Sequence, residues 1–259
     1  MVGLRHLPRR AGPRGPRAGR VRAAGEGART LTPSSRLRRA AARPWRTNLE
    51  HPFVRGIGDG TLQKRRFLHY LGQDHLFLVD YARVLALAAA RAPRVTDMAS
   101  FAELLHSTLG VEMALHRRLC AREGIASLSL ERTPAGPTTR AYGDFLVRAA
   151  YERDLAGLLA ALLPCMWGYA EIAAALRARG LPRVARYREW IETYAGEEFT
   201  ALAGLMRSMY DRVGSASAAE RELFLTGTRY ELAFWEASWQ ATPHPGGRGP
   251  PRTPRGVLQ

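Results

Sequence analysis

The sequence predicts an all-α protein, a single-domain helical bundle. Three observations support this fold class. Apolar residues recur at intervals of three and four through residues 59–240, no run of β-branched residues alternates with period two, and Pro and Gly cluster between the helical segments. The chain has 259 residues, which is enough to bury a core without disulfide bonds.

The first long helix is expected from the capping residues Asp59-Gly-Thr61 to Ala92, where Pro93 stops it. A second helix, or a broken pair, covers residues 96–123 and ends at Gly124. A loop rich in Pro and Gly then leads to a helix over 139–153 and a very apolar central helix over 155–180. Three more helices are expected over residues 183–194, 197–213 and 216–240.

The central helix is apolar enough to raise the question of a membrane span. Its run from Leu155 to Leu176 is interrupted by Pro164 and carries Glu171, and its neighbours are amphipathic helices. These features favour a buried core helix over a membrane segment.

The two ends of the chain have a different composition. Residues 1–34 are rich in Arg, Gly, Pro and Ala without apolar periodicity, so we expect a disordered extension: transit-like, dispensable, or the product of a start assigned too early. Residues 242–259 read as a second disordered tail. The helical domain is therefore expected over residues 35–241.

The net charge of +16 is concentrated at these ends. Residues 1–46 hold thirteen arginines and one acid, whereas residues 47–240 are close to neutral; Lys64 is the only lysine. This points to a bias toward Arg, and we expect neither a nucleic-acid nor a membrane partner. Two cysteines exclude a disulfide scaffold and a four-thiolate zinc site, and they suit a reducing, cytoplasmic compartment.

Cys165 is the more interesting of the two cysteines. Pro164 precedes it and should kink the helix. A thiol at the start of a restarted helical segment would have a lowered pKa. The alternative, which position alone favours, is a small buried apolar side chain. Cys120 has no comparable context and is expected to be a structural or surface thiol.

Asp74 lies one helical turn from both Tyr70 and Phe77, on a face that should point inward. An unpaired buried charge is prohibitive, so Asp74 must find a partner or serve a ligand. The alternatives are an ion pair with an Arg, or a position facing solvent.

Glu231 is in line with Trp235 and Trp239, whereas Glu236 falls off that line. Burial would raise the pKa of Glu231 and suit it to proton transfer. An aromatic stripe of this kind is also common in a plain helical core.

A metal site is the runner-up interpretation. Glu112 and His116 share a helix face at i and i+4, but none of the seven histidines lies between His116 and His244 to complete a di-iron set.

Seven separated motifs, taken together, resemble the thiaminase II (TenA) family of aminopyrimidine-hydrolysing enzymes. They follow the order and spacing of the family across residues 37–240. The motifs are HPFVRGIGDGTL (51–62), HYLGQDHLFLVDYARVLALAAA (69–90), EMALH (112–116), PTTRAYGDFL (137–146), LLPCMWGYAEI (162–172), WIETYAGEEF (190–199) and YELAFWEASW (230–239).

The resemblance implies a fold similar to haem oxygenase, without haem, enclosing a central pocket. It assigns the nucleophile to Cys165, the catalytic acid to Glu231 and the substrate-holding carboxylate to Asp74. Rings around the pyrimidine would come from Phe77, Tyr142 and Tyr194. It further implies a homotetramer that needs no metal or organic cofactor.

The implied reaction is hydrolysis of 4-amino-5-aminomethyl-2-methylpyrimidine to the 5-hydroxymethyl pyrimidine in thiamin salvage, with thiamin itself as a possible further substrate. Two departures stand out: Phe77 replaces a Tyr common in relatives, and Gly143 replaces a Ser or Thr, so that Tyr142 is expected to be positioned less firmly by its neighbour. They motivate an alternative, a non-catalytic pyrimidine-binding or regulatory protein on the same fold.

Overall fold

The computed structural model describes residues 31–125 and 133–241. The disorder expected for residues 1–30 and 242–259 lies outside the described residues, but Pro33 and Ser34, at the end of the expected 1–34 extension, are helical, so disorder was wrongly expected there. Every regular element of the described part is helical, which confirms the predicted all-α class. The elements are α1 (Pro33–Ala40), α2 (Ala42–Leu49), α3 (Pro52–Asp59), α4 (Lys64–Arg91), α5 (Val95–Ser107), η1 (Thr108–Glu112), α6 (Met113–Arg122), α8 (Pro137–Glu152), α9 (Leu155–Ala178), α10 (Ala185–Tyr194), α11 (Glu197–Val213) and α12 (Ala218–Gln240).

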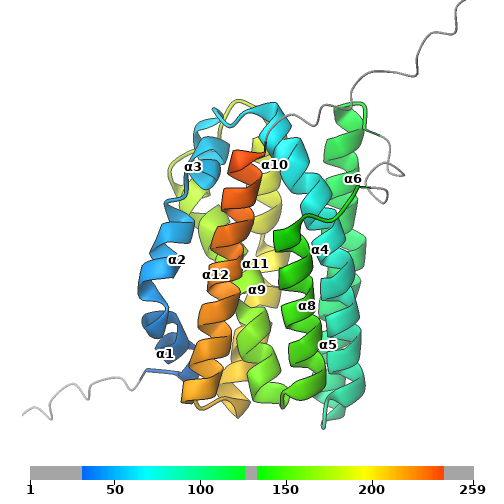
Figure 1. The fold of residues 1–259 in the computed structure, drawn as a ribbon, viewed down its shortest axis with the longest axis vertical. Coiled ribbons are helices and arrows are strands. Elements are labelled where there is room, and N and C mark those ends of the chain that lie inside the picture. The colour runs from blue at the N-terminus through cyan, green and yellow to red at the C-terminus, as the bar shows by residue number, and fades with distance from the viewer. Residues whose placement is uncertain (1–30, 126–132, 242–259) are drawn as a thin grey trace, which may run out of the picture. The chain divides into compact units, whose positions relative to one another are not determined.

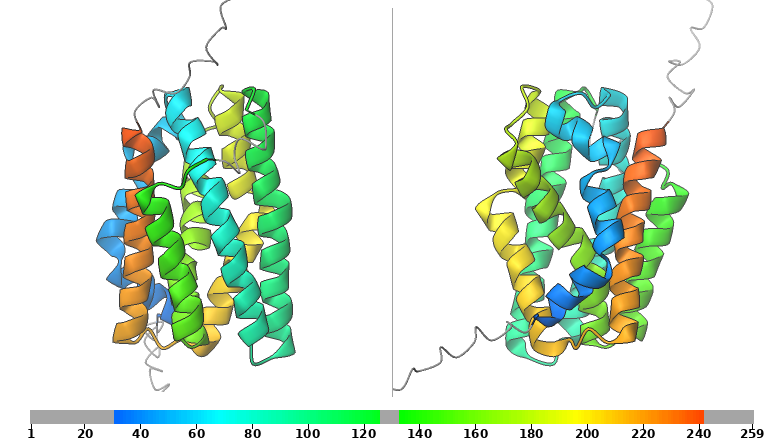
Figure 2. Two further views of the ribbon diagram at one scale, coloured as in Figure 1. Left: turned by 45° about the vertical axis from the view of Figure 1, so that its right-hand side comes forward. Right: turned by 90° about the vertical axis from the view of Figure 1, so that its left-hand side faces the viewer.

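Helix α9 is the core of the bundle. It packs most extensively against α12 and α11, while α4 packs against α8 and α5 (Figures 1 and 2). By length and composition α9 could cross a membrane, yet 72% of its most apolar window is buried inside the bundle. A helix that is apolar on all sides is expected in such a central position, as the sequence indicated.

The contact between α9 and α12 is very close at one point. A Cβ atom built on Gly227 of α12 would lie 2.9 Å from the Pro164 ring and 3.1 Å from the Ala161 carbonyl oxygen of α9. Glycine is therefore required for the two helices to approach to this distance.

The short helices α1, α2 and α3 were not predicted individually. Helix α1 begins at Pro33, and the backbone N–H and hydroxyl of Ser34 both donate to the Asp211 carboxylate of α11. In α2, Trp45 donates from its indole N–H to Glu171 of α9 at 3.1 Å. These buried contacts tie the N-terminal helices to the two helices behind them.

The long helix α4 begins at Lys64 and not at Asp59. Residues 52–59 form the separate helix α3, which ends at Gly60 in the left-handed conformation, with φ of 74°. Glycine adopts this conformation without a steric penalty, so the Asp59-Gly60 signal ends one helix before the next begins.

The expected helix over residues 96–123 is observed as helical structure over residues 95–122, with a π-helical turn inside it. Between α5 and α6 lies the π-helical turn η1, in which the N–H of Met113 bonds to the carbonyl of Thr108. Such turns insert an extra residue into a helix and are frequent at functional sites. This turn ends at Glu112, which is buried.

Candidate active site

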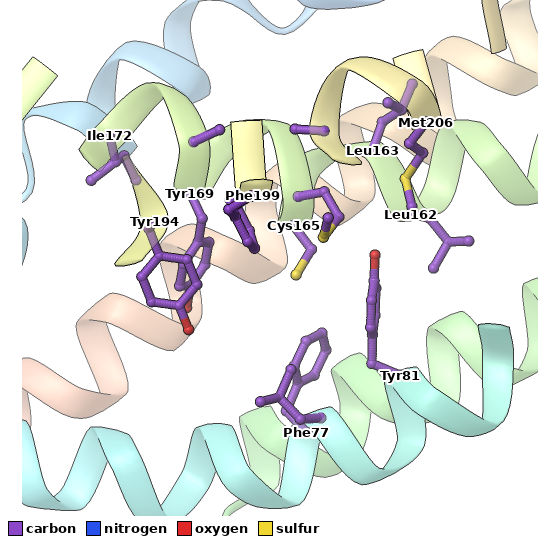
Figure 3. Packing of buried hydrophobic residues seen from close by; sticks show 14 of the residues in the cluster. Phe77, Tyr81, Leu162, Leu163, Cys165, Tyr169, Ile172, Tyr194, Phe199 and Met206 are labelled. Atoms are coloured by element: carbon purple, nitrogen blue, oxygen red, sulfur yellow. The ribbon is translucent and has the colours of Figure 1, made fainter. Parts of the chain in front are cut away.

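The six residues singled out by the sequence are all buried. They come from α4, α8, α9, α10 and α12, and none is more than 7% exposed: Asp74, Phe77, Tyr142, Cys165, Tyr194 and Glu231. In Figure 3 the Cys165 sulfur projects from α9 toward Phe77 and Tyr81 of α4, with Tyr169 and Tyr194 on its other side.

Burial raises the pKa of the Cys165 thiol well above its usual range, and the carboxylates of Glu231, Glu112 and Asp74 raise it further, in that order. The expectation of a lowered thiol pKa is therefore wrong. Helix α9 continues without a break through Pro164, so no helix N-terminus faces the sulfur. In place of a partial positive charge, the sulfur faces a low-dielectric pocket containing three acids.

Glu231 points from α12 to Tyr142 of α8, whose hydroxyl donates to it at 2.6 Å. Burial raises the pKa of Glu231 to about 8; the Tyr142 hydrogen bond opposes this shift, and the nearby charge of Asp74 adds to it. The raised pKa agrees with the sequence prediction. Glu231 therefore holds a proton at neutral pH and is able to act as an acid.

Asp74 is 3% exposed and has neither an Arg partner nor a solvent-facing position. The Tyr70 hydroxyl donates to its Oδ2 at 2.8 Å, and Nε2 of His116 lies 3.2 Å from the same oxygen. The indole N–H of Trp190 donates to the Tyr70 oxygen at 3.1 Å. Because an indole only donates, this bond directs the Tyr70 proton toward Asp74.

The predicted rings fall into two groups. Phe77 and Tyr142 pack with their centroids 4.6 Å apart, and Tyr142 also stacks on Tyr230 at 5.2 Å. Tyr194 instead packs on Tyr169 at 5.0 Å. Tyr142 is held by this stacking and by Glu231, so Gly143 does not leave it without support.

Sequence reasoning missed two buried groups of the pocket. Burial, and then the charge of Asp74, raise the pKa of Glu112 to about 8, although the sequence suggested Glu112 only as a metal ligand. Tyr81 lies within the motif over residues 69–90 but was not singled out. The signal that could have identified Glu112 is the EMALH motif, which places it one turn from His116.

Within the described ranges no group of three or more His, Cys, Asp and Glu side chains is arranged to hold a metal ion. His116, the other member of the metal pair considered above, contacts Asp74 through Nε2. The acids and the sulfur in this pocket thus interact with one another and with aromatic hydroxyls.

A hollow of about 680 Å³ lies beside the pocket. Arg65, His69, Gln73 and Phe234 are among the residues that line it. Phe234 also packs against Phe77, with centroids 6.1 Å apart, so this one ring borders both the hollow and the buried pocket.

The fold defines a class of helical bundles that bury one cysteine near three buried carboxylates. Within this class, residues 39–241 match the model of the TENA/THI-4/PQQC family. The chain belongs to this family, which confirms the resemblance drawn from its motifs.

Individual relatives agree with this assignment. The aminopyrimidine aminohydrolase of Halalkalibacterium halodurans is 40% identical over 203 residues, covering 75% of this chain and 90% of that protein. The solved TenA homologue from P. horikoshii OT3 is 33% identical, with a TM-score of 0.76 over 81% of this chain and 99% of that one.

A third comparison bears on the fold alone. A solved domain of unknown function with a heme oxygenase-like fold, from Shewanella denitrificans OS217, is 13% identical with a TM-score of 0.63. It covers 80% of this chain and 91% of that chain. The expected similarity to the haem oxygenase fold is confirmed.

Proposed function

We propose that this protein is an aminopyrimidine aminohydrolase of thiamin salvage. It converts 4-amino-5-aminomethyl-2-methylpyrimidine and water to the 5-hydroxymethyl pyrimidine and ammonia. The observation that carries the proposal is the position of the Cys165 sulfur in one buried pocket with Asp74 and Glu231, within a chain 40% identical to a relative of that name.

The chemistry requires a nucleophile because the amine leaves poorly from its carbon and water displaces it slowly. The Cys165 sulfur forms a bond to C6 of the pyrimidine, which breaks the aromaticity of the ring. Glu231, protonated because its pKa is about 8, gives its proton to the adjacent ring nitrogen as charge develops there.

The addition allows the amine to depart. Electrons from the 4-amino group and the ring flow toward the exocyclic carbon and expel the amine, which takes the thiol proton and leaves as ammonia. Water then adds its oxygen to this carbon and returns one proton to the sulfur. The carbon–sulfur bond breaks, the ring nitrogen returns its proton to Glu231, and aromaticity is restored.

Asp74 holds the substrate in register for this addition. Its Oδ2 already receives the Tyr70 hydroxyl and faces His116, which leaves its Oδ1 to accept from the 4-amino group. The rings of Phe77, Tyr142 and Tyr194 enclose the pyrimidine from the two sides described above. Orientation of this kind lowers the entropic part of the barrier.

The direct test is a product assay with the aminopyrimidine. We expect ammonia and the hydroxymethyl pyrimidine from the wild-type protein and neither from Cys165→Ala. Cys120→Ala, which removes a buried thiol outside the pocket, is the matched control and should retain turnover. Full activity of Cys165→Ala would reject covalent catalysis by this sulfur.

The alternative is a non-catalytic pyrimidine-binding or regulatory protein. The raised pKa of Cys165 favours it, because the resting group is a thiol and not a thiolate. Thermal stabilisation of the wild-type protein by the aminopyrimidine, without any product, would select this alternative.

The proposal includes four further properties. Thiamin carries its leaving group on the same carbon, so we expect slow cleavage of thiamin as well. We assign the catalytic domain to residues 35–241, in the cytoplasm, and expect a homotetramer. Exposed apolar side chains on one helical stretch, Val95, Met98 and Leu109, support subunit contacts, which light scattering would test.

A further inference from the structure

Tyr81 has a buried hydroxyl that the protein itself does not use. Its side chain is 1% exposed, and its oxygen has no hydrogen-bond partner among the described residues. Buried polar atoms are almost always paired, because an unpaired hydroxyl costs free energy on folding. An unpaired one beside a reactive sulfur indicates a ligand.

The position of this hydroxyl is defined by its neighbours. Figure 3 shows the Tyr81 ring standing on α4 with its oxygen directed toward α9, next to Cys165. Burial raises the pKa of Tyr81 well above its usual range, and the charges of Cys165, Glu112 and Glu231 raise it further. The group therefore remains a neutral phenol, able both to donate and to accept a hydrogen bond.

The other tyrosines of the pocket differ from Tyr81 in this respect. Tyr70 donates to Asp74 and Tyr142 donates to Glu231, so the hydroxyls of both are bonded to the two carboxylates. Phe77, one turn before Tyr81 on the same face, has no hydroxyl at all. Tyr81 thus presents the hydroxyl that remains available on this side of the sulfur.

We propose that the Tyr81 hydroxyl binds the exocyclic group on C5 of the pyrimidine, first the departing amine and then the entering water. This inference rests on the proposed function. When the sulfur lies over C6, the two ring atoms bonded to C6 are the nitrogen assigned to Glu231 and the carbon that carries the aminomethyl group. A hydroxyl beside the sulfur therefore meets the aminomethyl substituent, and Tyr81 selects for a polar group at this position.

Two ligands that differ only at this substituent test the inference. In the Cys165→Ala background, which binds without turnover, calorimetry would compare the 5-aminomethyl pyrimidine with 4-amino-2,5-dimethylpyrimidine. Adding Tyr81→Phe should weaken the aminomethyl ligand about tenfold, the loss of one hydrogen bond, and leave the dimethyl ligand within about twofold. Equal losses for both ligands, or no loss for either, would overturn it.

Thermal stability gives an independent readout. Removing an unpaired buried hydroxyl should leave the melting temperature of Tyr81→Phe equal to or above that of the wild type. The matched control is Tyr187→Phe, whose hydroxyl donates to the Leu62 carbonyl away from the pocket. That variant should melt lower with no selective loss of either ligand. A lowered melting temperature for Tyr81→Phe would assign a structural role and contradict the inference.

Failure of the proposed function would look different. If neither pyrimidine bound to Cys165→Ala and the wild type gave no product, the function itself would be rejected, and this inference with it. If both pyrimidines bound to Cys165→Ala and the wild-type protein formed product, the comparison of the two ligands would test only the role of Tyr81.

Discussion

Asp74 and Glu231 are two buried carboxylates in one pocket, but their surroundings differ. Two polar groups, Tyr70 and His116, meet one oxygen of Asp74, and Trp190 fixes the direction of the Tyr70 proton. Glu231 receives the single hydroxyl of Tyr142, and burial outweighs that bond, so its pKa rises to about 8.

The difference teaches how one residue type serves two purposes. The Tyr70 hydroxyl and His116 hold the carboxylate of Asp74 in place, whereas burial with little compensation lets Glu231 keep its proton. In this pocket Asp74 is suited to hold an amino group, and Glu231 is suited to give a proton. The surrounding helices, and not the acid itself, decide which role each one takes.

The largest expected effect comes from removing the acid. Glu231→Gln keeps the size of the side chain but has no transferable proton. We expect kcat to fall about 10²- to 10⁴-fold with a much smaller change in KM, since general acid catalysis is typically worth this much. Steady-state kinetics would measure both constants. A variant with normal kcat and raised KM would mean that Glu231 binds substrate and does not act as an acid.

A smaller effect, of a different kind, is expected at the other carboxylate. Asp74→Asn replaces the carboxylate that we propose accepts from the 4-amino group with an amide, and we expect substrate binding to weaken about 10- to 100-fold. Calorimetry in the Cys165→Ala background would measure this loss directly. Glu236→Gln, which alters an acid paired with His51 outside the pocket, is the control. Unchanged affinity in Asp74→Asn would show that Asp74 does not hold the substrate, and the contrast with Glu231 would be lost.

The third effect concerns folding stability. The pKa of Glu231 is raised from 4.5 to about 8 in the folded protein, so the native state binds a proton that the unfolded chain releases between these pH values. Its stabilising contribution is present below about pH 4.5 and is lost as the pH rises toward 8.

Glu231→Gln should therefore flatten the fall of unfolding free energy between pH 5 and 7.5, by at most about 1.4 kcal/mol per pH unit. Urea unfolding at several pH values would measure both slopes. Glu112, raised to about 8 in the same way, would keep a residual slope in the variant. Identical slopes in the two proteins would show that Glu231 is ionised in the folded state.

Much of the fold could be predicted from sequence because its signals are local. Residues 197–213 were expected to form a helix and do so with the same bounds, since Gly196 and Gly214 flank a clear periodic pattern. The three short helices over residues 33–59 were not predicted, because eight-residue segments give little periodicity. Docking on α12, α9 and α11 stabilises them, and such contacts cannot be read from local sequence.

Some features of the candidate site could likewise be predicted from sequence, and others could not. The motifs brought Cys165, Asp74 and Glu231 to attention, and the structure brings them to one pocket. The pKa of the thiol could not be predicted, because it depends on burial by the assembled helices and on charges from three elements far apart in the chain. Glu112 faces inward at the end of a π-helical turn, and Tyr81 is distinctive only because its hydroxyl lacks a partner.

The close contact of Gly227 with Pro164 has a consequence for the reaction geometry. Cys165 directly follows the proline, and Glu231 lies one turn beyond the glycine, so this contact sets the gap between the proposed nucleophile and the proposed acid. Even a methyl group at 227 would push the two helices apart while leaving every reactive side chain intact. Such a protein would contain the full set of functional groups and still misalign them by a few tenths of an ångström.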